Sequence, residues 1–311
     1  MKWNKVKTII SFTFSDNIRM KRTFALIALF ILLFVTSMRF TAITFIRQAL
    51  RTPHLRKAPD FSLLFFQNLL SNLALLLPFI GVMFGYDVVS GERERGTLRI
   101  ILVQPIYRDE FLLGKFLGSL ITMIFIITVS MSISTGISAA LYGIVLNTSI
   151  LWKFLLVILI STLYSTAWYA ISLLVSIFSR RTSISALISI AIALIVIVIA
   201  PIIVTTYVMM TNPPPIFTGS ESPQSRQSMI REWAMKVQRI QAQLTSFLPD
   251  TQFRRLIRSI VIVKNDLALS ELILETSKAM LQSALSLTYI ILLAILPLIA
   301  SFIVFIKQEL K

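Results

Sequence analysis

The sequence predicts an all-α, polytopic membrane protein with six transmembrane helices. Hydrophobic residues make up 56% of the 311 residues and charged residues only 14%, whereas about 25% of the residues in an average soluble domain are charged. The mean hydropathy is +0.82, and the apolar residues fall in long runs. Because about 20 helical residues cross a hydrocarbon core roughly 30 Å thick, these runs argue against a water-soluble domain.

The first predicted span contains a charge, Arg39, after fifteen apolar or small residues. We retain this span because a long basic side chain can reach the interface by snorkelling. A cleaved signal peptide is the alternative, but the preceding segment is long and mixed, and no A-x-A-like site follows. The six spans are expected at 24–46, 61–86, 116–146, 154–179, 184–210 and 279–306.

The distribution of Lys and Arg predicts that both termini are cytoplasmic. Six spans place both ends on one side, and with both ends inside, the inner segments hold 15 basic residues. The outer segments hold 6 once the long segment 211–278 is left out, as long segments translocate largely regardless of charge. The chain then divides into a cytoplasmic segment (1–22), helices one to five (23–210) with the inner loop 87–115, an extracytoplasmic loop (211–278), and helix six with a short tail (279–311).

The amino-terminal segment 1–22 has apolar residues at every fourth position, Val6, Ile10, Phe14 and Ile18, among basic side chains. This pattern is typical of an amphipathic helix lying on the inner membrane surface. A basic flank that only fixes the topology would account for the same charges.

The outer loop 211–278 opens with a Pro- and Gly-rich stretch that ends at Pro223 and cannot be helical. Apolar residues then recur at spacings of three and four, which predicts a helix, and shorter helical patterns follow around 253–263 and 267–277. The loop could be an external gate, a docking site for an outer partner, or a small helical cap. The first helix has its apolar residues at Ile230, Trp233, Val237, Ile240, Leu244 and Phe247.

The composition excludes several kinds of chemistry. The chain has no Cys and one His, so we expect neither a thiol site nor a Cys- or His-based metal site. It also lacks a phosphate-binding loop of the G-x-x-x-x-G-K-[ST] type. The last five spans contain no Asp, Glu, Lys, Arg or His, whereas ion-coupled transporters usually keep such residues at their sites. Because these catalytic motifs are absent, we expect no enzyme, and because the basic residues are spread over both faces of the membrane, we expect no nucleic-acid binding. Any work of transport should come from a partner.

The inner loop 87–115 is dense in charge and nearly neutral. Gly91 and Gly96 permit turns, and 98–103 can form a short amphipathic helix that Pro105 ends. Two acidic residues after it suit the first turn of the next helix, where the macrodipole favours anions. Such a loop can dock a soluble partner or can be a solvated connection.

The run GERERGTLRIILVQPIYRDEFLLGKFLG resembles the signature of type-2 ABC transporter permeases, the membrane subunits of ABC exporters. In that family an E-R-E-x-G-T-L stretch precedes an apolar turn, then P-[IVL]-x-R and a third helix headed by Lys. The matching positions are Glu92, Arg93, Glu94, Gly96, Thr97, Leu98, Pro105, Arg108, Gly114 and Lys115.

The resemblance implies a half-transporter in the cell membrane, without a cofactor of its own. Two copies would form the pathway, and two cytoplasmic ABC ATPase subunits carrying ATP and Mg would bind the inner loops. It also implies that 1–22 is an amphipathic elbow and that 98–103 is a coupling helix. The coupling loop residues would be Glu92, Arg93, Glu94, Arg95, Gly96, Thr97, Leu98, Ile101, Pro105 and Arg108.

Two further groups of residues are candidates for a second inner contact and for a pathway lining or helix-packing face. Arg180 and Arg181 lie in the short loop between spans four and five, as a second inner contact or as a topology anchor. A polar patch in span two could line a pathway or join helices, as could Gly81-x-x-x-Gly85 and a small-residue ridge in span three. The patch comprises Gln67, Asn68, Ser71 and Asn72.

Two other functions remain open from the sequence. One is a membrane anchor or assembly factor that binds an extracytoplasmic partner through 211–278. The other is a self-sufficient secondary transporter, which the lack of Asp, Glu, Lys, Arg and His in the last five spans disfavours. Neither needs a charged loop between spans two and three.

Overall fold

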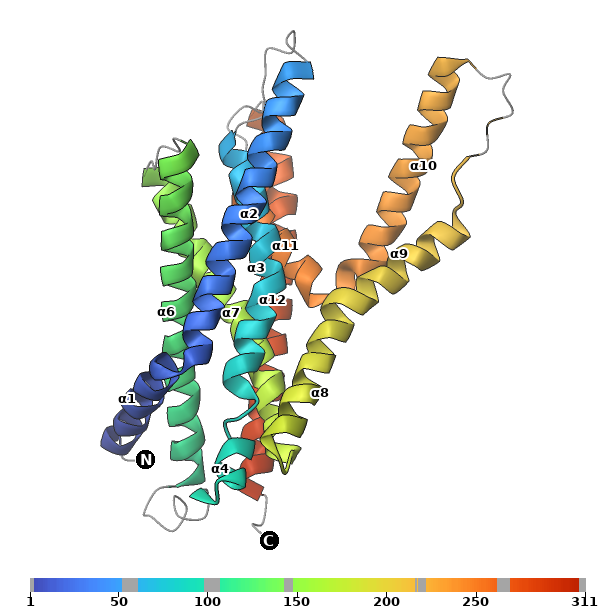
Figure 1. Ribbon diagram of the computed structural model, residues 1–311. Coiled ribbons are helices and arrows are strands. Elements are labelled where there is room, and N and C mark those ends of the chain that lie inside the picture. Colours follow the sequence, from blue (N-terminus) through green and yellow to red (C-terminus); the bar gives the residue numbers. More distant parts are fainter. Residues whose placement is uncertain are drawn as a thin grey trace.

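In the computed structural model, the described residues (3–51, 61–97, 107–142, 148–215, 217, 222–261 and 269–307) contain helices and no strand. Long helices run side by side, and the two termini are near the same end (Figure 1). The helices are α1 (Trp3–Arg19), α2 (Lys21–Arg51), α3 (Phe61–Gly85), α4 (Ser90–Glu94), α6 (Arg108–Tyr142), α7 (Thr148–Phe178), α8 (Thr182–Leu194), α9 (Ala200–Thr211), α10 (Pro223–Leu244), α11 (Pro249–Val261) and α12 (Leu269–Lys307).

Five stretches of the described chain are long and apolar enough to span a membrane: those of α3, α6, α7, α8 with α9, and α12. Each overlaps a predicted span, and α6 and α12 begin earlier than their predicted spans, at Arg108 and Leu269. The prediction that acidic residues occupy the first turn after the inner loop is confirmed, because Asp109 and Glu110 lie in the first turn of α6. The first predicted span, 24–46, falls within the continuous helix α2.

Helices α3 and α7 pack closely at the centre of the bundle. A Cβ atom at Gly81 would lie 2.2 Å from the carbonyl oxygen of Ser165, and one at Gly85 would lie 2.7 Å from that of Tyr169. The hydroxyls of Ser165 and Ser172 also donate hydrogen bonds to backbone carbonyls of α3. Small residues and interhelical hydrogen bonds of this kind hold membrane helices together, so Gly81 and Gly85 form a helix-packing face.

Helix α1 crosses one end of α6 (Figure 1). A Cβ atom at Gly114 would lie 2.6 Å from the Ile9 side chain, and one at Gly118 would lie 2.6 Å from the Cβ of Thr13. The side of α1 toward α6 therefore includes polar positions as well as apolar ones. Of the predicted apolar positions, Val6 is fully buried, and Ile10, Phe14 and Ile18 are half-buried.

The fifth predicted span is not one straight α-helix. A π-helical turn, η1 (Ile195–Ile199), separates α8 from α9. Five consecutive β-branched residues crowd this turn, and Pro201 has no N–H to donate to the carbonyl four residues earlier. Beyond the turn, α9 leads away from the bundle, and α10, which contacts α9, also stands apart from the bundle (Figure 1). The predicted helix at 230–247 is observed mainly as α10, with Val237 buried and Phe247 78% exposed.

Candidate functional site

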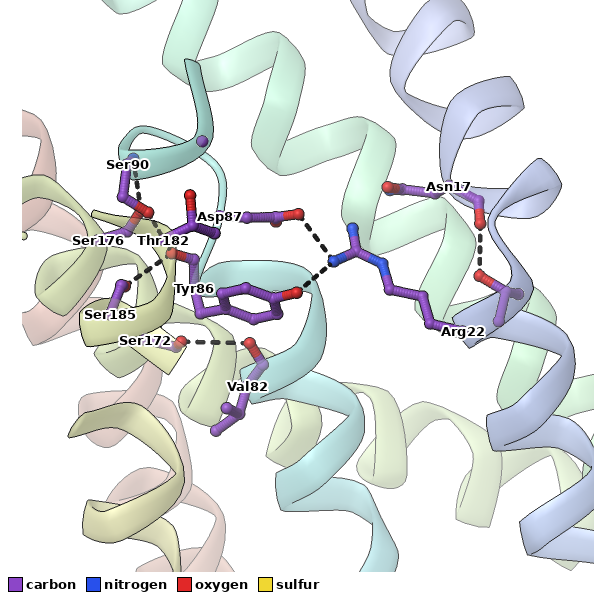
Figure 2. A network of polar contacts seen from close by, with 12 residues as sticks. Asn17, Arg22, Val82, Tyr86, Asp87, Ser90, Ser172, Ser176, Thr182 and Ser185 are labelled. Carbon is purple, nitrogen blue, oxygen red and sulfur yellow. Dashed lines mark hydrogen bonds and ion pairs between the residues drawn. The ribbon is translucent and has the colours of Figure 1, made fainter. Parts of the chain in front are cut away.

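The short charged helix α4 lies at the end of the bundle where both termini lie (Figure 1). Its preceding residue, Val89, supplies no side-chain cap. Instead, the Ser176 hydroxyl of α7 accepts hydrogen bonds from the N–H groups of Val89 and Ser90, at 3.1 and 3.0 Å. The first N–H groups of a helix have no partner within it, so α7 supplies the acceptor at which α4 begins (Figure 2).

The turn between α3 and α4 is tied to the start of α2. The Arg22 guanidinium lies 2.7 Å from the Asp87 carboxylate and 3.0 Å from the Tyr86 hydroxyl (Figure 2). It also lies 5.7 Å from the ring centre of Phe84, within cation–π range. Burial lowers the pKa of the Arg22 guanidinium, but the charge of Asp87 and the two hydrogen bonds outweigh burial and raise that pKa.

The same turn is also bonded to α8. The backbone carbonyl of Tyr86 accepts hydrogen bonds from the hydroxyls of Ser90 and Ser185, each at 2.7 Å. Figure 2 shows these contacts between the end of α3 and the neighbouring helices. One carbonyl beyond the end of α3 thus joins α4 and α8.

Arg93 and Glu94 join α4 to the turn between α7 and α8. The Arg93 guanidinium donates to the carbonyls of Ile177, at 3.1 Å, and Ser179, at 2.8 Å, where α7 ends and its dipole favours a cation. The Glu94 carboxylate accepts from the N–H of Thr182 at 2.9 Å and from its hydroxyl, where α8 begins and its dipole favours an anion. The two adjacent charges therefore match two adjacent helix ends.

Glu92 points into the protein. Its carboxylate lies 2.9 Å from the Lys115 ammonium of α6, and the two side chains are only 12% and 14% exposed. The Thr97 hydroxyl donates to the same carboxylate at 2.5 Å. Gly96, which lies between Glu92 and Thr97 in the sequence, has a φ of +72°, a left-handed conformation that favours glycine. These contacts close the inner loop back onto the start of α6.

The first turn of α6 contacts the end of α12. The Arg108 guanidinium donates to the carbonyl of Ile306 at 3.3 Å, and Glu110 accepts from the N–H of Tyr107 at 3.4 Å. A cation at a helix C-terminus and an anion at a helix N-terminus are both favourable. Arg108, predicted as a coupling residue, therefore also holds two helices together.

The predicted contact residues differ in how far their side chains are exposed and so accessible to a partner. Arg95, Arg180 and Arg181 are exposed, and Glu94 is exposed beside them, although its carboxylate caps α8. We call these four residues the exposed charged surface. The predicted residues Leu98, Ile101 and Pro105 lie outside the part of the chain that the structure describes.

Of the polar patch predicted in span two, the structure describes the side chain of the last residue, Asn72. The side chain of Asn72 is half-buried, and its amide nitrogen has no hydrogen-bond partner among the described residues. The side chains of Gln67, Asn68 and Ser71 lie outside the described part. In the span-three ridge, Ser132, Gly136 and Ala140 are exposed.

Sequence reasoning missed a second group of functional candidates, on α11. The pattern around 253–263 predicted a short helix in an external loop, but α11 packs against α3, α7 and α12. Its arginines, Arg254, Arg255 and Arg258, line a cavity beside α10. The signal was present in the sequence, because the apolar and basic residues of this helix lie on opposite faces.

Comparison with known proteins gave one family and two relatives. The family model described as ABC-2 family transporter protein matches residues 8–310. The protein named "Probable ABC transporter permease protein NosY" of Pseudomonas aeruginosa is 45% identical over 51 residues, and that of Stutzerimonas stutzeri is 43% identical over 51 residues. Each match covers 16% of this chain and 18% of the relative, so the alignments span less than a fifth of the relatives' length.

Proposed function

We infer that this chain, which belongs to the ABC-2 family of transporter proteins, is the membrane permease subunit of an ATP-driven exporter. Membership of this family implies an ATPase partner subunit. In our proposal the chain itself hydrolyses nothing and binds no cofactor, and ATP and Mg belong to the partner. Five long apolar stretches among the described residues and the short charged helix α4 at one end of the bundle support this role.

The proposed membrane topology has six spans, with α2 as the first. Its apolar run at 24–46 and its continuous helix support this assignment. Helix α1 would lie as an elbow on the cytoplasmic surface. The end that carries α4 and both termini would face the cytoplasm, in keeping with the 15 basic residues on the inner segments.

The observation that carries the proposal is the attachment of α4. Its residues and the preceding turn are bonded to α2 through Arg22, to α6 through Lys115, and to α7 and α8 through Ser176 and Thr182. A partner that moved this loop would therefore act on four further helices together. This arrangement suits a subunit that receives mechanical work from an ATPase.

We propose that two copies of the chain form the pathway and that each inner loop binds one ATPase subunit. The exposed charged surface is the proposed contact, together with the coupling segment 98–103. Glu92 and Arg93 would hold this surface in place, because their charges are already used within the chain. Three of the four exposed residues are arginines, so we expect an acidic docking surface on the partner.

The test is co-purification of the tagged chain from its native membranes. We expect an ABC ATPase subunit with the wild-type chain and about tenfold less of it with the double variant Arg95→Glu, Arg181→Glu, because reversing charges at an interface makes attractive contacts repulsive. The matched control is Arg231→Glu, Lys236→Glu, which reverses two exposed charges on α10.

The outcomes separate two parts of the proposal. If no ATPase co-purifies with the wild-type chain, the result would contradict the exporter role and favour a membrane anchor or assembly factor. An ATPase that remains bound to the Arg95, Arg181 variant at the wild-type level would contradict the assigned contact surface only.

A further inference from the structure

A cavity of about 770 Å³, lined largely by polar and charged residues, lies between α9, α10, α11 and α12. Helix α11 contributes three arginines to its lining, Arg254, Arg255 and Arg258, and the other helices contribute neutral residues such as Gln241 and Ser283. Figure 1 shows α11 between α10 and the main bundle, away from α4. The cavity is thus separate from the site formed around α4.

The orientation of α11 is fixed by its apolar face. The ring of Phe253 stacks on Tyr164 of α7, with ring centres 4.6 Å apart, and Leu256 and Ile257 are buried. The Ser286 hydroxyl of α12 donates to the side-chain oxygen of Gln252 at 2.7 Å. Because these contacts hold one face of α11 against the bundle, the arginines are held toward the cavity.

The lining carries more positive than negative charge. Asp250 lies 2.9 Å from Arg254 and pairs with it. No carboxylate of the described residues forms an ion pair with Arg255 or Arg258. Among the described lining residues, Asp250 is the one acid against three arginines, so an anion entering the cavity would find two cations without a counter-charge.

Helix α11 packs among the apolar stretches. Three residues in contact with α11 or the cavity belong to the apolar stretches: Tyr164 lies in Lys153–Phe178, Pro201 in Thr182–Thr211, and Ser283 begins Ser283–Lys307. Ionisable residues at the depth of membrane helices are rare and mark ligand or ion pathways. The arginines of a charged helix packed among such stretches are therefore candidates for binding a ligand.

We propose that this cavity binds a phosphate-type oxyanion, either as a free ion or as the headgroup of an anionic phospholipid. The guanidinium fork matches phosphate geometry and can donate two parallel hydrogen bonds. Arg255 and Arg258 supply the principal contacts, while Arg254 remains paired with Asp250. The site does not depend on the exporter role, because binding requires no nucleotide and no partner subunit.

The test uses the full-length chain and two probes. In the first arm, inorganic phosphate is titrated calorimetrically into protein held in phosphatidylcholine nanodiscs. In the second arm, native mass spectrometry compares how much phosphatidylglycerol and phosphatidylcholine remain bound after release from vesicles that contain equal amounts of both. The double variant Arg255→Gln, Arg258→Gln is compared with Arg231→Gln, which removes one exposed arginine outside the cavity.

We expect binding in at least one arm, weakened about tenfold or more in the double variant and unchanged in Arg231→Gln. Binding of phosphate identifies a free ion, whereas selective retention of phosphatidylglycerol identifies a lipid headgroup. No binding of either probe by the wild-type chain, or equal binding by the double variant, would overturn the proposal. If the double variant does not fold, the single variant Arg258→Gln replaces it, because the Arg258 side chain is exposed. Arg258→Gln should weaken binding several-fold, and unchanged binding would overturn the proposal.

Discussion

Ser176 is a single hydroxyl on which the position of α4 depends. It accepts hydrogen bonds from two consecutive backbone N–H groups of another segment, and both Ser176 and Ser90 are fully buried. The sequence offers no signal for this role, because serine is common in the helices of this chain and Ser176 lies 86 positions from Ser90. Only the packing of α3 against α7 brings the two together.

Replacing this serine tests the role directly. We expect Ser176→Ala to lower the free energy of unfolding by about 1–3 kcal/mol, because two buried N–H groups lose their acceptor. The measurement is thermal or denaturant unfolding of the purified chain in detergent. Ser228→Ala is the matched control, since Ser228 is exposed and its hydroxyl bonds only within α10. Equal stability of the two variants would contradict the capping role.

At the scale of elements, the close contact of α3 with α7 depends on two glycines. We expect Gly81→Ala to destabilise the protein by about 1–3 kcal/mol or more, because overpacking forces the helices apart and the added Cβ would lie 2.2 Å from a backbone oxygen. Gly136→Ala is the control, since a Cβ there meets nothing within 4 Å and alanine favours a helix. Unfolding temperatures of both variants in detergent measure the difference. Equal temperatures would contradict the packing role of Gly81.

The long helices could be predicted from the sequence because the bilayer sets the length of an apolar run. The runs at 61–86 and 154–179 agree with α3 and α7 to within six residues at each end. The π-helical turn at Ile195–Ile199 and the packing of α11 against α3, α7 and α12 could not be predicted in the same way. Apolar periodicity shows which face of a helix is buried, but it does not show which partner buries that face.

The inner site was predictable in composition and not in geometry. The motif indicated the charged inner loop, where Arg95 is exposed, and Arg180 and Arg181 are exposed in the neighbouring turn between α7 and α8. Glu92 and Arg93 instead contact Lys115 and the end of α7, because a short helix with adjacent charges can satisfy the free ends of neighbouring helices. Such pairing depends on where α7 ends and α8 begins in space.

At the scale of the whole molecule, the natural absence of cysteine gives a direct test of topology. We expect an impermeant maleimide to label Ser222→Cys on intact cells and to label Arg180→Cys only after permeabilisation, because our topology places these exposed positions on opposite sides of the membrane. Labelling with and without permeabilisation is the measurement. Arg180→Cys labelled on intact cells would reverse the proposed orientation.

The hold of Glu94 on Thr182 has a mechanical consequence. The contact lies at the first turn of α8, and α8 is a stiff rod about 20 Å long whose far end is the π-helical turn at Ile195–Ile199. A displacement of α4 would displace α8 as a unit up to this turn, where the hydrogen-bond pattern of the helix is irregular. Pro201, six residues after Ile195, borders the arginine-lined cavity. A continuous stretch of helix, interrupted by one π-helical turn, therefore joins the Glu94 contact to the border of the arginine-lined cavity.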